Sequence, residues 1–100
     1  METQHVHYYL AVCKELNLTR AAKLCGIAQP SLTAAMQRLE QQVGGALFLR
    51  STRPPYVQLT DLGRELLPIF IKIDELIRRT SGLLGNIERK RRRAPKPRTE

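Results

Sequence analysis

The stretch Gln29–Val43, with the sequence QPSLTAAMQRLEQQV, determines how the rest of the chain is interpreted. Its apolar residues recur at steps of three and four, which predicts a helix with one buried stripe. These residues are Leu32, Ala35, Met36, Leu39 and Val43. The opposite face carries amides, hydroxyls and methyl groups and almost no charge, although a face that only meets water usually carries Lys and Glu. Such a face suits contact with base edges in a nucleic-acid groove.

Signals at both ends delimit this predicted helix. Pro30 suits the first turn, because proline lacks an amide hydrogen that would have no partner there. Gly44 and Gly45 end the helix, since glycine accepts the left-handed backbone of a helix exit.

Two shorter helices are predicted before this stretch. Val6, Tyr9 and Cys13 fall at helical spacing and predict a helix over about residues 3–16. A second, short helix is predicted over residues 20–25, with Thr19 as its N-cap, because a threonine hydroxyl can accept a hydrogen bond from a free amide. Gly26 and a tight turn then lead into the central helix.

Two extended pieces are predicted after the central helix. Residues 47–50 and 57–59 flank a loop that contains Arg53 and two prolines. Their alternation is short, but together they indicate a two-stranded hairpin, with Arg53 beside its tip.

A long helix is predicted over residues 61–87. Thr60 caps it, and Asp61 suits its positive end. At 1.5 Å per residue it would be about 40 Å long, with a kink expected at Pro68. Because so small a core cannot cover the apolar stripe of this helix, we expect a dimer in which the helix pairs with a second copy. The alternative is that the stripe packs against a further domain that is missing from this chain. The expected dimer interface consists of Leu66, Ile69, Phe70, Ile73, Leu76 and Ile77.

The order of these elements predicts a mainly α fold: a winged helix-turn-helix of three helices plus a two-stranded wing, followed by a long dimerisation helix. We expect a DNA-binding domain at residues 1–60, the dimerisation helix at 61–87 and a disordered basic tail at 88–100. A B-form major groove is about 12 Å wide and admits one helix, so the central helix would enter it while the wing reaches the neighbouring backbone.

The charge of the chain points to a polyanionic partner. The formal net charge is +8, and residues 88–100 carry seven basic residues against two acids. Because this tail has almost no apolar side chains, we expect disorder there. The alternative function is therefore a non-specific module, driven by the tail, that binds RNA, DNA or an acidic membrane surface.

Several other classes of protein find no support. The chain has no Ser/His/Asp set, phosphate-binding glycine loop or cysteine spacing typical of a metal site, so we expect no enzyme and no cofactor. His5 and His7 point about 200° apart on a helix and are expected at the surface. Cys13 and Cys25 are expected to be small buried hydrophobes. No apolar run reaches the roughly 18 residues of a membrane span, and no secretory signal begins the chain, so we expect a cytoplasmic protein.

The ordered residues also resemble the amino-terminal domain of LysR-type transcriptional regulators. The matching positions are Ala21-Ala22, Gln29-Pro30, Leu39-Glu40, Gly44, Leu47-Phe48, Arg50, Leu59-Thr60 and Gly63. The resemblance runs from about Val6 to Ile77. It implies a winged helix-turn-helix with a linker helix, which as a homodimer binds double-stranded DNA at an interrupted palindrome near a promoter, in association with the bacterial nucleoid. Members usually continue into an effector domain of roughly 200 residues. This chain ends in a basic tail instead, so we expect no effector-sensing domain and no small-molecule effector in this chain. It is either a naturally short regulator or an excised DNA-binding part.

The resemblance, together with the outer face of the central helix, predicts which residues contact DNA. Base contacts are expected from Gln29, Pro30, Thr33 and Gln37, for which an ordinary solvated face is the alternative. Contacts to the DNA backbone or minor groove are expected from Arg20, Ser31, Arg38, Arg50 and Arg53. For Arg50, an ion pair with Glu40 is an equally weighted alternative.

Three positions depart from the family pattern. Ala28 replaces the usual serine before Gln29, which removes an expected helix cap. Ala34 stands where many relatives carry a basic residue that contacts DNA, and Cys25 takes a position that is usually a core leucine. The first two departures indicate weaker or different base recognition within the same fold.

Overall fold

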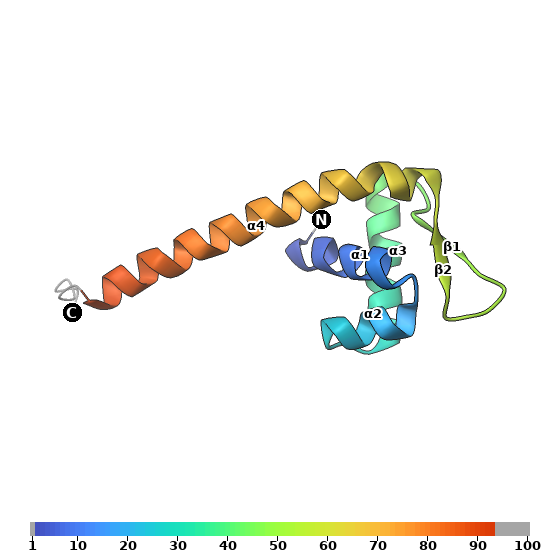
Figure 1. Ribbon diagram of the computed structural model, residues 1–100, viewed down its shortest axis with the longest axis horizontal. Helices are drawn as coiled ribbons and strands as arrows, with labels where there is room; N and C mark the ends of the chain where they lie inside the picture. Colours follow the sequence, from blue (N-terminus) through green and yellow to red (C-terminus); the bar gives the residue numbers. More distant parts are fainter. Residues whose placement is uncertain (1, 94–100) are drawn as a thin grey trace.

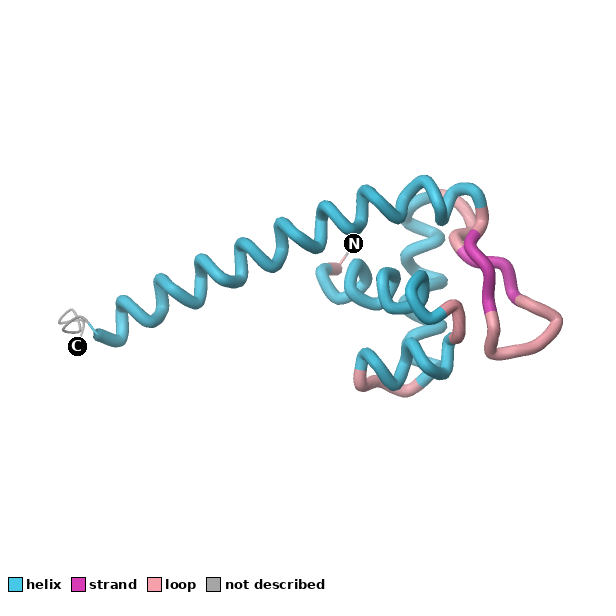
Figure 2. Tube along the Cα trace, viewed as in Figure 1, coloured by secondary structure: helices cyan, strands magenta, loops and turns pink. Residues whose placement is uncertain are grey.

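The computed structural model of the chain describes the backbone of residues 2–93 and the side chains of residues 2–82. In chain order the elements are α1 (Thr3–Glu15), α2 (Leu18–Cys25), α3 (Gln29–Val43), β1 (Phe48–Arg50), β2 (Val57–Leu59) and α4 (Asp61–Arg93). The first three helices form the body of the domain, β1 and β2 extend beside it as the wing, and α4 crosses over α1 and leaves the body (Figure 1, Figure 2). The winged helix-turn-helix plan is confirmed.

The core is built around α1 and the inner face of α3. The largest side chains that are fully buried are Tyr9, Leu32, Leu39, Leu47, Val6 and Val12. Four of the five residues of the predicted α3 stripe are buried, and Val43 is half-buried at its end. Burying each leucine contributes about 1.5–3 kcal/mol, so this stripe fixes which side of α3 faces inward.

The start of α2 differs from the sequence-based prediction. Asn17, and not Thr19, is the N-cap: its backbone is extended and its Oδ1 accepts a hydrogen bond from the amide of Arg20 at 3.0 Å. The helix therefore begins earlier than expected, and Thr19 lies inside the first turn. Asn17 also forms an antiparallel bridge with Tyr56, while the amide of Leu18 donates to the carbonyl of Pro55. The cap thus ties α2 to the wing.

A tight joint connects the wing to α4. β1 and β2 pair antiparallel, with Phe48 opposite Leu59. The Thr60 hydroxyl accepts from the amide of Gly63 at 3.0 Å and donates to the carbonyl of Ala46 at 2.7 Å, which confirms Thr60 as the cap of α4. The buried Tyr9 hydroxyl donates to the carbonyl of Gly63. Burial raises the pKa of Tyr9, so this phenol stays protonated as a donor.

The inner side of α4 belongs to the core of the same chain. Phe70 is only 3% exposed, and its ring centroid lies 4.7 Å from that of Tyr9. Its assignment to a dimer interface was therefore wrong, because the joint at Thr60 turns α4 back over α1. Leu66, Ile73 and Ile77 are partly buried against this core, whereas Ile69 and Leu76 are 52% and 53% exposed.

α4 is longer than the sequence predicted. It continues through Pro68 and ends at Arg93, six residues beyond the expected end at Ile87. Residues 88–93, for which disorder was expected, thus continue the helical backbone, since Lys and Arg are good helix formers and cations favour a helix C-terminus. Residues 94–100 of the expected tail lie outside the described residues.

The buried side of α1 is also wider than its apolar stripe. His5 is 6% exposed, which corrects its expected place at the surface, and its Nδ1 has no hydrogen-bond partner among the described residues. The reason is that α2, α3 and α4 all pack on α1. His7 is exposed, as expected.

The two cysteines behave as packing residues. Both thiols are half-buried and unpaired, and both lie against the core. Burial raises the pKa of the Cys13 thiol to about 11 and also raises the pKa of Cys25. Because the thiolate is the reactive form, both are poor nucleophiles at neutral pH, which favours the packing interpretation.

We predict that Gly63→Ala destabilises the fold. A Cβ at this position would overlap the backbone carbonyl of Leu47, so α4 would have to move away from the wing. The expected loss is about 1–3 kcal/mol in the free energy of unfolding, measured by chemical denaturation.

Gly82→Ala is the matched control, because a Cβ there meets no atom within 4 Å. It should stabilise the helix by about 0.5–1 kcal/mol. An unchanged free energy of unfolding for Gly63→Ala would refute the tight joint.

Candidate nucleic-acid interface

The face of α3 opposite the core is open to solvent. Pro30, Ser31, Gln37 and Arg38 are exposed, and Thr33 is half-buried at the edge of this face. None of these side chains is enclosed by the protein, so all are available to a partner. The face combines an amide, hydroxyls and a proline ring with one flanking guanidinium, as the sequence predicted.

Gln29 lies at the start of the same helix and is half-buried. Its Oε1 accepts a hydrogen bond from the Thr19 hydroxyl at 3.1 Å. Ala28, the N-cap residue of α3, makes no side-chain cap hydrogen bond, as its replacement of the usual serine led us to expect. The position of the Gln29 side chain therefore depends on α2, a contact that sequence reasoning missed because it had assigned Thr19 to capping.

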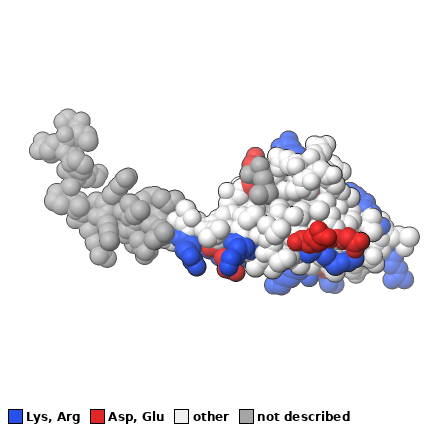
Figure 3. All heavy atoms as spheres, turned by 90° about the horizontal axis from the view of Figure 1, so that it is seen from above, with Lys and Arg blue, Asp and Glu red and all other residues white. Residues whose placement is uncertain are grey.

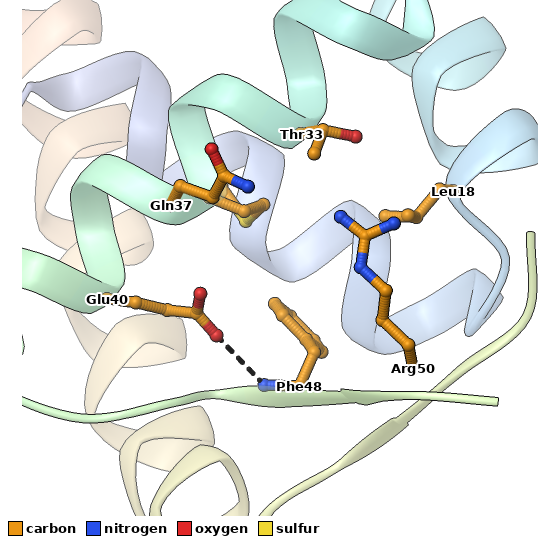
Figure 4. Close-up of a pocket in the computed structure, with 7 residues that line it drawn as sticks. Leu18, Thr33, Gln37, Glu40, Phe48 and Arg50 are labelled. Atoms are coloured by element: carbon orange, nitrogen blue, oxygen red, sulfur yellow. Dashed lines mark hydrogen bonds between the residues drawn. The ribbon is translucent and has the colours of Figure 1, made fainter.

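Glu40 fixes the wing relative to α3. One carboxylate oxygen of Glu40 accepts from the amide of Leu47 at 2.7 Å. The same oxygen accepts from the amide of Phe48 at 3.3 Å (Figure 4). These amides begin the wing, so the carboxylate sets the distance between the strand and the helix. Hydrogen bonds that involve a charged group contribute about 1.5–3 kcal/mol each.

The alternative ion pair between Arg50 and Glu40 is wrong. In the described part of the chain, the ion pairs join Arg64 to Asp61 and Arg78 to Asp74. Arg50 is exposed, and its guanidinium extends from β1 toward α2 and α3, beside Leu18 (Figure 4). Arg50 also lines a small hollow together with Leu18, Thr33, Met36, Gln37, Glu40 and Phe48. This hollow brings the positive charge of Arg50 next to the uncharged face of α3.

The remaining basic candidates lie at the surface. Arg53 is exposed in the loop between the strands, where its amide donates to the Ser51 hydroxyl at 3.1 Å and its carbonyl accepts from the amide of Tyr56 at 3.0 Å. Arg20 is exposed on α2. Seen from above, Lys and Arg lie around the edge of the folded body, while Asp and Glu gather mainly in one patch (Figure 3).

The described residues form neither a metal site nor a membrane-spanning helix. No group of three His, Cys, Asp or Glu side chains lies close enough to hold a metal ion there. No helix in that part of the chain has the length and apolar character needed to cross a bilayer.

The sequence matches a known family over most of the folded part. Residues 3–64 match the sequence model described as "Bacterial regulatory helix-turn-helix protein, lysR family". A probable cat1 operon transcriptional activator of Acinetobacter lwoffii is 48% identical over 64 residues, which are 64% of this chain and 20% of that protein. BudR of Klebsiella aerogenes is 48% identical over 63 residues, which are 63% of this chain and 43% of that protein. The chain thus spans less than half the length of these two relatives.

Solved structures show the same fold. The DNA-binding domain of CbnR in complex with DNA has a TM-score of 0.74 at 34% identity, and the match covers 93% of this chain and 100% of that one. The DNA-binding domain of BenM in complex with catB site 1 DNA has a TM-score of 0.77 at 33% identity, and the match covers 88% of this chain and 97% of that one.

We predict that Glu40→Ala loosens the wing. The amides of Leu47 and Phe48 would lose their charged acceptor, which should lower the free energy of unfolding by about 2 kcal/mol and speed hydrogen exchange in the wing. Denaturant titration and exchange of the two amides, followed by NMR, measure both effects.

Glu65→Ala serves as the control, because it removes an exposed carboxylate from α4 without touching the wing. If both variants exchange these amides at the same rate, Glu40 does not anchor the wing.

Proposed function

Because the chain belongs to the LysR family of bacterial helix-turn-helix regulators, we propose that it binds double-stranded DNA sequence-specifically and regulates transcription. The observation that carries this proposal is the exposed, nearly uncharged face of α3 beside the guanidinium of Arg50. Amides and hydroxyls on one helix can pair with base edges in a major groove, while a neighbouring guanidinium pairs with phosphate. The DNA complexes of CbnR and BenM, which share the fold, support the same partner.

In this proposal the contacts divide by chemistry. Residues on the outer face of α3 reach base edges, and residues around it bind phosphates or the minor groove. The base-contacting set is Gln29, Pro30, Thr33 and Gln37. The set for the backbone or the minor groove is Arg20, Ser31, Arg38, Arg50 and Arg53. Every member is at least partly exposed, so each side chain is accessible to a duplex.

We also propose that two copies act together through α4. Ile69 and Leu76 are large, apolar and more than half exposed, and Leu76 lines an open groove with Thr3, Ile73 and Ile77. A second copy would cover these side chains and place two copies of α3 on the halves of an interrupted palindrome. Phe70 is no part of this interface.

Other sequence-based expectations remain proposals. A cytoplasmic location in association with bacterial DNA follows from the proposed partner. The chain itself spans only part of the length of its relatives. The alternative function, non-specific polyanion binding, rests on the basic residues from Arg89 onward, some of which extend α4.

We predict that Gln29→Ala and Arg53→Ala affect binding differently. Gln29→Ala removes a base contact and should relax the preference at one base pair by about 1–3 kcal/mol. Arg53→Ala removes a contact to the backbone or minor groove and should weaken binding to all duplexes similarly. Duplexes selected from a random pool, titrated by fluorescence anisotropy at several salt concentrations, measure this. Each neutralised phosphate should contribute about −0.9 to the slope of log affinity against log salt.

A chain that ends at Ile87 tests the alternative. Sequence-specific binding that falls by less than about tenfold, or 1.4 kcal/mol, would show that the tail is auxiliary. Equal binding of all duplexes by the wild type, or complete loss of binding in the shortened chain, would contradict the proposal.

We predict that Leu76→Asp produces a monomer, because a carboxylate on the apolar face of α4 would have to be buried in the dimer. Sedimentation equilibrium measures the mass. Arg78→Asp is the control: it introduces the same residue on another side of α4, where it removes the ion pair between the exposed Arg78 and Asp74 and adds a like charge four residues from Asp74. Together these changes should cost the helix only about 0.5–1 kcal/mol. A Leu76→Asp chain that still sediments as a dimer would exclude this interface.

A further inference from the structure

We propose that Thr19 is a positioning residue for base recognition. Its hydroxyl holds the oxygen of the Gln29 amide, turns the amide nitrogen toward the duplex and thereby makes Gln29 select a base that presents a hydrogen-bond acceptor. This inference rests on the proposed function and goes beyond it, since it assigns a chemical preference to one position of the DNA site.

The Thr19 hydroxyl has a well-fixed position. Thr19 lies in the first turn of α2, directly after the Asn17 cap, and α2 packs on α3. The Thr19 Oγ1 lies 3.1 Å from Gln29 Oε1, and both side chains are half-buried. Two hydrogen bonds fix the turn that carries this hydroxyl. The Arg20 amide donates to the Asn17 side chain, and the Leu18 amide donates to the carbonyl of Pro55.

This hydrogen bond restricts a side chain that would otherwise rotate. A glutamine has several rotatable bonds, and ordering them during binding costs conformational entropy. Ala28 makes no side-chain cap hydrogen bond at this helix end, so it supplies no polar anchor there. The Thr19 hydroxyl thus orders Gln29 before DNA arrives.

The hydrogen bond from Thr19 also determines which end of the Gln29 amide faces the duplex. A glutamine amide has an oxygen that accepts and a nitrogen that donates two hydrogen bonds. The oxygen has two acceptor positions; Thr19 takes one of them and draws the oxygen toward α2, so that the nitrogen with its two N–H donors is the end turned toward the duplex. In the major groove guanine presents N7 and O6, adenine presents N7 and thymine presents O4 as acceptors, whereas cytosine presents the donor N4. Gln29 should therefore disfavour cytosine at the base that it contacts.

The test uses the full chain with Thr19→Val, which keeps the shape but removes the hydroxyl, and Thr19→Ser, which keeps the hydroxyl. The base pair under Gln29 is first located as the one whose preference Gln29→Ala abolishes. Affinities are then measured for duplexes that carry each of the four bases there. The wild type and Thr19→Ser should disfavour cytosine by about tenfold, and Thr19→Val by about twofold or less.

A combined variant separates positioning from packing. In the Gln29→Ala background, Thr19→Val should not change base preference further, because its only route to the DNA has been removed. Thermal unfolding of each variant reports any loss of stability, which would not by itself change the relative affinities for four bases.

The outcomes separate this inference from the proposed function. If the wild type shows a base preference and Thr19→Val keeps the same discrimination against cytosine, the inference is overturned while DNA recognition stands. If Thr19→Ser loses discrimination as fully as Thr19→Val, the hydroxyl is not responsible, and the inference is again overturned. A wild type without any base preference overturns both.

Discussion

The burial of one side of α3 is the constraint from which the rest of the structure follows. Leu32 and Leu39 are completely enclosed, and Met36 is nearly so. A helix that gives one face to the core must turn the other outward. That outward face carries amides and hydroxyls in place of the usual charges, and so the packing of the core determines which side chains can meet a partner.

Hydrogen bonds hold the wing and α4 in fixed positions relative to α3. Glu40 holds the start of the wing against α3. The Thr60 hydroxyl, at the end of the wing, bonds both the carbonyl of Ala46 and the amide of Gly63 in α4. Tyr9 then joins α1 to Gly63 in the first turn of α4. These contacts join separate elements, so the wing and α3 keep a fixed spacing. If α3 enters a groove while the wing contacts the flanking backbone, a fixed spacing between them means that few protein groups have to be ordered on binding, which lowers the entropic cost.

Local patterns in the sequence predicted most of the elements but not their mutual contacts. The α3 stripe, the Thr60 cap and the outward Gln37 follow from helical periodicity and cap chemistry, which depend on neighbouring residues. Asn17 displaced Thr19 as a cap because the wing holds Asn17 in an extended backbone. His5 and Phe70 are buried because α4 folds back over α1, and no local spacing encodes that arrangement.

The central claim is that the uncharged face of α3 enters a duplex, and an NMR titration with a selected duplex tests it most directly. The account predicts that the side-chain amide signals of Gln29 and Gln37 shift most, together with backbone amides in the first turns of α3. Signals from the buried side of α1 should stay in place. Shifts concentrated beyond residue 87, with those of α3 unchanged, would contradict the account.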